Sequence, residues 1–224
     1  MSILNPVVSK FSLAAGVVQE IYSCPANKSH AIVDLTFYKD NLTQDAIIAA
    51  ALTTASNPSN LTSVDYFIDD IELIGVVNSA ELNKVIVGKG ERLYLRVIQG
   101  PNIVVRLSGV EENNPKVLKA GRLAAAVISN TSQTKIFENN LQNIAYTSCS
   151  MTIFNTSANN TAEIQAWISF SDTTGISDKI LNISVLPQDT AIIENILMVP
   201  NERIFIQSNQ PNTEYFINGI MVST

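Results

Sequence analysis

The sequence predicts an all-β protein with two tandem, homologous antiparallel β-sandwich domains of a jelly-roll-like kind, and an internal repeat is the main reason. The segment Ser79–Leu95 recurs as Thr190–Ile206 at an offset of 111 residues, which aligns Glu91 with Glu202. A period this long exceeds the roughly 20–50 residues of solenoid repeats, so it indicates duplication of a whole domain. The second observation is a hydrophobic alternation of period two in both copies, which is typical of half-buried strands.

The alternation is plainest at Val33–Phe37 in the first copy and at Cys149–Ile153 in the second. The last two strands of each copy are expected to form a hairpin, because the connections between them are short and contain Gly, Pro and Asn. These strands are expected at Leu93–Ile98 with Ile103–Val110, and at Ile204–Gln207 with Tyr215–Val222.

The segment Asp45–Leu52 has the residue types of a short helix, but its counterpart in the second copy argues against one. Thr161–Ile168 aligns with it at an offset of 116 residues and alternates apolar with polar side chains. Because duplicated domains share one backbone, both segments are predicted to be strands. Short strands, frequent turns and the lack of a convincing helix together favour β-sandwiches.

The repeat also divides the chain. We expect an N-terminal arm at residues 1–10, a first sandwich at 11–112, a linker at 113–122 and a second sandwich at 123–224. Pro115 and Gly121 punctuate the linker. Its basic residues Lys116, Lys119 and Arg122 are interpreted as part of a solvated connector.

Composition excludes several classes of partner. The 224 residues carry a net charge of −6, and charged residues are only 15% of the chain while hydrophobic ones are 46%. An acidic chain without a basic stripe is not expected to bind nucleic acid. No apolar run is long enough to span a membrane, and no secretory signal is expected at the N-terminus. The few charges favour a surface that partners cover in part, so a homo-oligomer is expected.

Side chains that carry chemistry are sparse. Cys24 and Cys149 have no partner within their own copies, so both are predicted to be buried free thiols in a protein assembled in a cytoplasm. The single histidine, His30, starts a strand and has no accompanying nucleophile motif. No catalytic residue, no zinc site and no cofactor is predicted, and the chain is not expected to be an enzyme.

Two weaker candidates remain. The first is an acidic group whose carboxylates could supply oxygen ligands to a hard cation, although a solvated loop and strand start explains it better. It consists of Asp65, Asp69, Asp70 and Glu72. The second is a set of aromatic side chains, Trp167, Tyr38 and Phe154, expected to face outward on neighbouring strands. An outward Trp on a sandwich favours contact with another subunit over stacking on a sugar.

Several motifs resemble a module of structural proteins in tailed-bacteriophage virions. These are Ile21–Lys28 with its Cys-Pro-x-x-Lys ending, Ala31–Phe37, Val85–Leu95 and the terminal strand ending Gly109–Glu112. The first copy matches along nearly its whole length. The second copy is looser, because Asn139 stands where the first has Cys24.

The resemblance implies a non-enzymatic part of a virion, of the head decoration, neck or tail accessory type. Its partners would be capsid or tail subunits, and it would be assembled in the host cytoplasm. A carbohydrate-binding module that recognises a host surface, in a tail fibre or baseplate, is the alternative. That alternative requires an exposed aromatic shelf or a cation at the acidic group.

Overall fold

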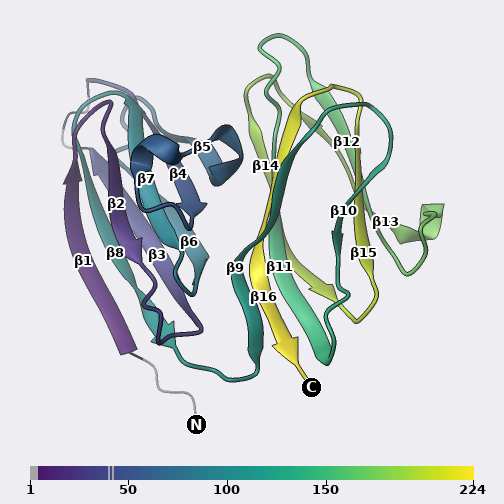
Figure 1. Ribbon diagram of the computed structural model, residues 1–224. Helices are drawn as coiled ribbons and strands as arrows, with labels where there is room; N and C mark the ends of the chain where they lie inside the picture. The colour runs from purple at the N-terminus through teal and green to yellow at the C-terminus, as the bar shows by residue number, and fades with distance from the viewer. Residues whose placement is uncertain (1–4, 40, 42) are drawn as a thin grey trace. The chain divides into compact units, whose positions relative to one another are not determined.

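The computed structural model of the protein describes residues 5–39, 41 and 43–224, and these residues are almost entirely β-strands and turns (Figure 1). The strands of the first half are β1 (Asn5–Leu13), β2 (Val18–Ser23), β3 (His30–Lys39), β4 (Ala46–Thr53), β5 (Tyr66–Leu73), β6 (Ser79–Gly88), β7 (Arg92–Gln99) and β8 (Ile103–Glu112). Those of the second half are β9 (Val117–Ile128), β10 (Thr134–Glu138), β11 (Ile144–Phe154), β12 (Ala162–Ser169), β13 (Lys179–Val185), β14 (Thr190–Met198), β15 (Arg203–Ser208) and β16 (Thr213–Ser223). Short 3-10 helices lie at η1 (Pro58–Asn60), η2 (Ser63–Asp65) and η3 (Ile176–Asp178).

The chain divides into two compact units. The first contains the chain up to Pro115 together with Ala120–Arg122, and the second contains Lys116–Lys119 and Leu123–Thr224. We call them the first and second sandwich. The expected duplication into two β-sandwich domains is confirmed.

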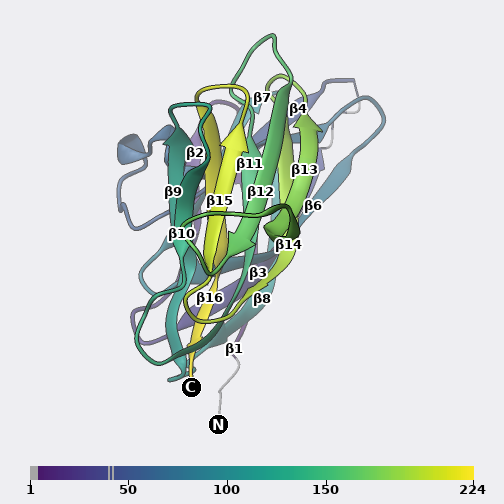
Figure 2. The ribbon, with the colours of Figure 1, turned by 90° about the vertical axis from the view of Figure 1, so that its right-hand side faces the viewer.

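Both sandwiches have the same strand order. The two sheets of the first are β1-β8-β3-β6 and β2-β7-β4-β5. Those of the second are β9-β16-β11-β14 and β10-β15-β12-β13, and Figure 2 views this sandwich with the latter sheet in front. This eight-stranded arrangement of two packed antiparallel sheets is a jelly roll.

The two copies also share their irregularities. β3 has a register shift between Val33 and Leu35 against β6, and β11 has one between Cys149 and Met151 against β14. Opposite each bulge lies a glycine of the last strand, Gly109 in β8 and Gly219 in β16. A Cβ atom on Gly109 would lie 2.3 Å from the Ile32 carbonyl oxygen, so the close approach of the strands requires glycine there.

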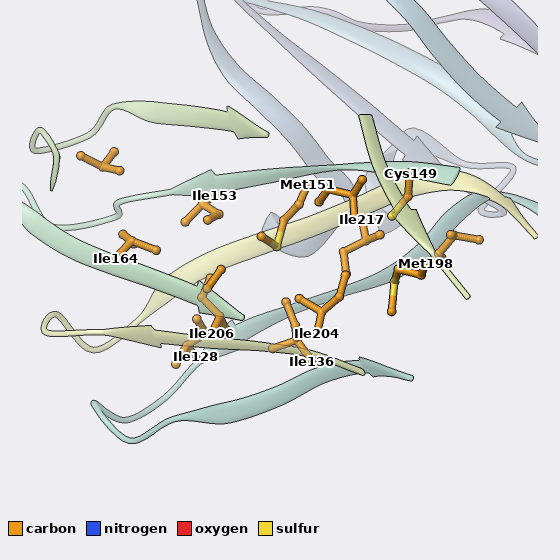
Figure 3. Close-up of a cluster of buried hydrophobic side chains, with 14 of the residues drawn as sticks. Ile128, Ile136, Cys149, Met151, Ile153, Ile164, Met198, Ile204, Ile206 and Ile217 are labelled. Carbon is orange, nitrogen blue, oxygen red and sulfur yellow. The ribbon is translucent and has the colours of Figure 1, made fainter. Parts of the chain in front are cut away.

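Each sandwich encloses its own apolar core. The second is drawn in Figure 3, where Met151, Ile153 and Ile217 from one sheet face Ile164, Ile204 and Ile206 from the other. In the first sandwich the fully buried side chains include Phe37, Leu52, Leu95 and Leu107. Burying a side chain of this size contributes roughly 1.5–3 kcal/mol relative to leaving it exposed.

The observed strands confirm one expected element and contradict the expected hairpins. Asp45–Leu52 is indeed a strand for most of its length, because β4 spans Ala46–Thr53. The expected terminal hairpins are wrong: β7 and β8 lie in different sheets, as do β15 and β16. The connections are short, but in a jelly roll the chain crosses between sheets at this point.

The expected arm and linker need correction as well. Asn5–Lys10 belongs to β1, which pairs with β8 along its whole length, and residues 1–4 of the expected arm lie outside the described residues. The end of the expected linker, Val117–Arg122, forms the start of β9. Both segments precede the part of the sequence that visibly repeats, so the repeat alone does not place them in the sandwiches.

Candidate interaction surface

The turn between β5 and β6 presents apolar side chains to solvent. Ile74, Val76 and Val77 are 48%, 86% and 50% exposed. The turn is compact, since Val77 N–H donates to the Ile74 carbonyl over 3.0 Å and Gly75 has a positive φ of 57°. We call Ile74–Val77 the β5–β6 tip.

The buried side chain of Lys39 holds the base of this tip. Lys39 is 3% exposed, and its Nζ donates to the carbonyls of Leu73 at 2.8 Å, Gly75 at 2.9 Å and Gln44 at 3.0 Å. An ammonium has three donors, so all of them are used. On the outer side, Asp45 Oδ1 accepts the Gly75 N–H at 2.7 Å. The tip is therefore anchored to the β3–β4 connection at both ends of Gly75.

The second sandwich has a different buried side chain at the equivalent position. Asn155 takes the place of Lys39 at the 116-residue offset and is 1% exposed. Its Nδ2 donates to the carbonyls of Asn160 at 2.8 Å, Val185 at 3.0 Å and Leu186 at 3.0 Å. The side chain of Leu186 is 60% exposed at this turn. Each sandwich thus exposes an apolar residue at its fifth connection, the turn between its fifth and sixth strands. We call the buried polar side chain beneath this turn, Lys39 or Asn155, the clamp.

The outer face of the β1–β8 ladder carries basic and apolar side chains together. Lys10 and Arg106 are paired in register, and both are exposed. Val8, two residues along the same face of β1, is 67% exposed. Among the described residues, no ion pair includes Lys10 or Arg106. We call Val8, Lys10 and Arg106 the basic face.

The repeated Glu-Arg dipeptide, which revealed the duplication, has a structural role. Glu91 Oε2 accepts the Gly88 N–H at 2.8 Å, and Glu202 Oε2 accepts the Val199 N–H at 2.7 Å. Each carboxylate therefore caps the turn before the seventh strand of its sandwich. The arginines that follow form ion pairs with neighbouring strands, Arg92 with Glu20 at 2.6 Å and Arg203 with Glu138 at 3.0 Å.

In the first sandwich, Glu91 also binds the chain that leaves it. Its Oε1 accepts the Arg122 N–H at 3.1 Å, and the Arg122 guanidinium pairs with Asp65. Burial raises the pKa of the Asp65 carboxyl, but hydrogen bonds from Thr62 and Arg122 outweigh it and lower that pKa overall. The expectation that Arg122 is part of a solvated connector is therefore wrong.

His30 lies in a polar group at the end of β3. It is 2% exposed, and burial lowers its pKa despite the opposing effect of Glu112, whose carboxylate lies 3.9 Å from Nε2. The Ser29 hydroxyl lies 3.0 Å from His30 Nδ1, but it also donates to the Glu112 carbonyl and accepts the Asn114 N–H. These contacts fasten the end of β8 and give the serine a structural role.

The predicted aromatic set is divided between the two sandwiches. Tyr38 lies on β3 of the first sandwich, whereas Phe154 on β11 and Trp167 on β12 lie in opposite sheets of the second. Tyr38 is 44% exposed, but Trp167 is only 7% exposed. A register shift after Ala166 pairs Trp167 with Lys179, whose Nζ lies 5.4 Å from the ring centroid. The outward shelf expected from alternation is absent at Trp167, because the strand is irregular there.

The acidic group is similarly divided. Asp65 is the last residue of η2 and is engaged by Thr62 and Arg122, whereas Asp69, Asp70 and Glu72 belong to β5. Across the described part of the chain, no group of three or more His, Cys, Asp or Glu side chains is arranged to hold a metal ion. Within the same residues, no helix is long and apolar enough to cross a membrane.

Sequence reasoning missed the residues that shape the tip. Lys39 follows an alternating strand and has the residue type of an exposed strand end, and Asn155 looks like a loop residue. Aligning the two copies would have placed them at one position, but a Lys and an Asn share no obvious role. The exposed run Val76-Val77 was the available signal for the tip, since two adjacent valines in a turn are unusual.

Comparisons with known proteins find structures of low similarity only. No family model matches the sequence, and no curated protein matches it significantly. The chain is similar in structure to the STIV MCP, with a TM-score of 0.41 and 9% identity over 100% of this chain and 97% of that one. It is also similar to the major capsid protein P2 from bacteriophage PM2, with a TM-score of 0.42 and 13% identity over 97% and 98%.

A tandem CBM22-1-CBM22-2 domain from Paenibacillus barcinonensis Xyn10C gives a TM-score of 0.29 and 8% identity, covering 100% of this chain and 93% of that one. Because all these TM-scores and identities are low, the jelly-roll assignment rests on the strand order and pairing themselves.

Proposed function

We propose that this protein is a non-enzymatic structural component of a virion, where it binds and stabilises neighbouring capsid or tail subunits. The observation that carries the proposal is the presence of two complete jelly rolls in tandem, with identical strand orders. Jelly rolls of this kind build viral capsid and lectin domains. The sequence motifs that resemble tailed-bacteriophage structural proteins favour the first of these, as a head decoration, neck or tail accessory protein.

The duplication suits a subunit that contacts two similar neighbouring sites. Each sandwich presents an apolar side chain above a rigid clamp, Val76 over Lys39 and Leu186 over Asn155. Tethering two such sites raises the effective concentration of the second once the first is bound, so weak contacts add up to stable attachment. In this proposal the protein resides in the virion and is assembled in the host cytoplasm.

The carbohydrate-binding alternative shares the fold, because lectin domains are also jelly rolls. It requires an aromatic platform open to a sugar ring, and Trp167 is covered. A glycan array distinguishes the two: saturable binding that a Trp167→Ala variant abolishes would favour the alternative. The structural proposal expects no such binding.

The direct test uses size-exclusion chromatography with light scattering on the purified chain, with and without virus particles stripped of accessory proteins. We expect a defined oligomer, or saturable binding at a fixed copy number per particle. A chain that stays monomeric and ignores the particles would overturn the proposal.

A further inference from the structure

We propose that the β5–β6 tip of one chain docks on the basic face of a second copy of the same chain. This inference rests on the proposed function and names the contact through which copies assemble. Its parts are the apolar Ile74–Val77 turn on one copy and the side chains of Val8, Lys10 and Arg106 on the other.

The tip has the properties of a docking element. Val76 is 86% exposed and forms a small apolar patch with the half-exposed Ile74 and Val77, and contiguous exposed apolar groups mark interaction sites. The three hydrogen bonds of Lys39 and the bond from Gly75 to Asp45 hold the turn in one conformation before any contact forms. A pre-organised loop loses little conformational entropy on binding, so even a small apolar contact contributes to affinity.

Charge favours the basic face as the surface that receives the tip. The tip has acidic neighbours, since Glu72 and Asp45 are both exposed beside it. The chain has a net charge of −6, so these acidic groups favour contact with a cationic surface over contact with the more numerous acidic groups of a second copy. The basic face offers two exposed cations, Lys10 and Arg106, next to the 67% exposed side chain of Val8. Apolar and charged groups are therefore complementary between the two surfaces.

The contact would join two different surfaces of the same chain. Such a heterologous contact leaves a free tip on one copy and a free face on the other, so it continues into a ring or an open array. That behaviour fits a component present in many copies of a particle. The exposed acidic groups argue against insertion of the tip into an anionic membrane, since they would be repelled by its surface.

The test is a charge-reversal cycle on the full-length chain, followed by sedimentation velocity over a range of concentrations. Glu72→Lys and Arg106→Glu each place like charges across the contact, and we expect each to weaken self-association about tenfold or more. The double variant restores opposite charges in the reverse sense, so its self-association should return to within about threefold of wild type. Both residues are exposed, so neither change disturbs a core.

A second pair of variants tests the apolar part. Val76→Asp should reduce self-association about a hundredfold, because it places a carboxylate in the apolar contact. The matched control is Val17→Asp, since Val17 is 50% exposed in the turn between β1 and β2 and belongs to neither the β5–β6 tip nor the basic face. The control should associate like wild type. Unchanged circular dichroism shows that each variant is folded.

The outcomes separate this inference from the proposed function. Wild-type self-association that survives Glu72→Lys, Arg106→Glu and Val76→Asp unchanged would overturn the docking contact and leave the structural role standing. A monomeric wild type that still binds stripped particles would also overturn the docking contact and leave the structural role standing. A monomeric wild type that ignores particles would overturn both. Flotation of that monomer with neutral phosphatidylcholine vesicles, lost in Val76→Asp, would instead assign the tip to lipid.

Discussion

The two sandwiches use different side chains to donate hydrogen bonds to the same group of buried backbone carbonyls. At the junction between the third strand and the fifth connection, backbone carbonyls point inward and need donors. The first sandwich supplies the ammonium of Lys39, and the second supplies the amide of Asn155. The backbone requirement has been kept since the duplication, whereas the side chain that meets it has changed. Buried polar groups are therefore best identified by their partners and only secondarily by residue type.

A second pair shows the same divergence. Cys24 and Asn139 occupy one position, and the N–H of each donates to the carbonyl of the aligned glutamate, Glu91 or Glu202, at 2.9 Å. Asn139 is fully buried, and its amide also bonds the Val199 carbonyl at 2.8 Å. The Cys24 thiol, in contrast, lies 3.9 Å from the carbonyl of the next residue, Pro25. By contrast, Gly109 and Gly219 have not changed, because no side chain fits there.

The largest expected effect comes from removing the first clamp. Lys39→Met leaves three inward carbonyls without their donor, and each lost partner costs about 1–3 kcal/mol. We expect the first sandwich to lose about 3 kcal/mol or more of unfolding free energy. The only tryptophan, Trp167, lies in the second sandwich, so its fluorescence reports that unit alone. In urea, circular dichroism should show an early transition while the Trp167 transition stays in place.

The matched control for this change is Lys89→Met, which removes an exposed lysine from the turn after β6. It should leave both transitions within about 0.5 kcal/mol of wild type. If Lys39→Met behaves like this control, the clamp does not hold the first sandwich together.

The corresponding change in the second sandwich should have a smaller effect. Asn155→Leu removes an amide that donates to three carbonyls with only two hydrogens, so fewer full bonds are lost. We expect a loss of about 2 kcal/mol, this time in the Trp167 transition. Asn159→Ala, in the exposed part of the same loop, is the control. A shift of the first-sandwich transition instead would show that the two units do not unfold separately.

These clamps also mark the limit of what the sequence predicts. The strands follow from alternation, and the repeat resolved even the helix-like Asp45–Leu52, because its copy at Thr161–Ile168 alternates clearly. The pairing of the strands does not follow from the sequence pattern. A short turn can join two strands of one hairpin, and it can equally join two strands of opposite sheets. The expected hairpin of β7 with β8 failed for this reason.

The candidate site was predicted less well than the fold. Trp167 was expected outward from strict alternation, but a one-residue register shift turned its ring toward Lys179. Arg122 was assigned to a solvated linker because its partners Glu91 and Asp65 are 31 and 57 residues away in the chain. Pairings over such distances depend on tertiary structure, and no local pattern encodes them.

The contacts of Arg122 with Glu91 and Asp65 have no counterpart among the second-sandwich contacts that involve Glu202. They therefore offer a third way to distinguish the stability of the two sandwiches. Asp65→Asn should destabilise the first sandwich by about 1 kcal/mol, since the ion pair is partly exposed. The pKa of Asp65 is lowered in the folded state. Its contribution is therefore complete above the unfolded-state value of about 3.9 and is lost as pH falls through the lower folded-state pKa.

Urea midpoints of wild type and Asp65→Asn should accordingly converge on acidification from pH 6 to below pH ~3. Arg122→Ala combined with Asp65→Asn closes a double-mutant cycle. Additive effects in that cycle would show that the two side chains do not interact in solution.

The smallest effect concerns the two thiols, one in each sandwich. Both are free and buried, as predicted. Burial, with the negative charges of Glu111 and Glu91, raises the pKa of Cys24 to about 11, and burial alone raises the pKa of Cys149 to about 12. Since the thiolate is the reactive form and both thiols are buried, each should react with a maleimide at pH 8 at least about tenfold more slowly in the native protein than in urea. Mass spectrometry of timed samples measures both rates, and urea should make them equal. Labelling of Cys149 as fast in the native protein as in urea would mean that local opening of β11 controls its reaction.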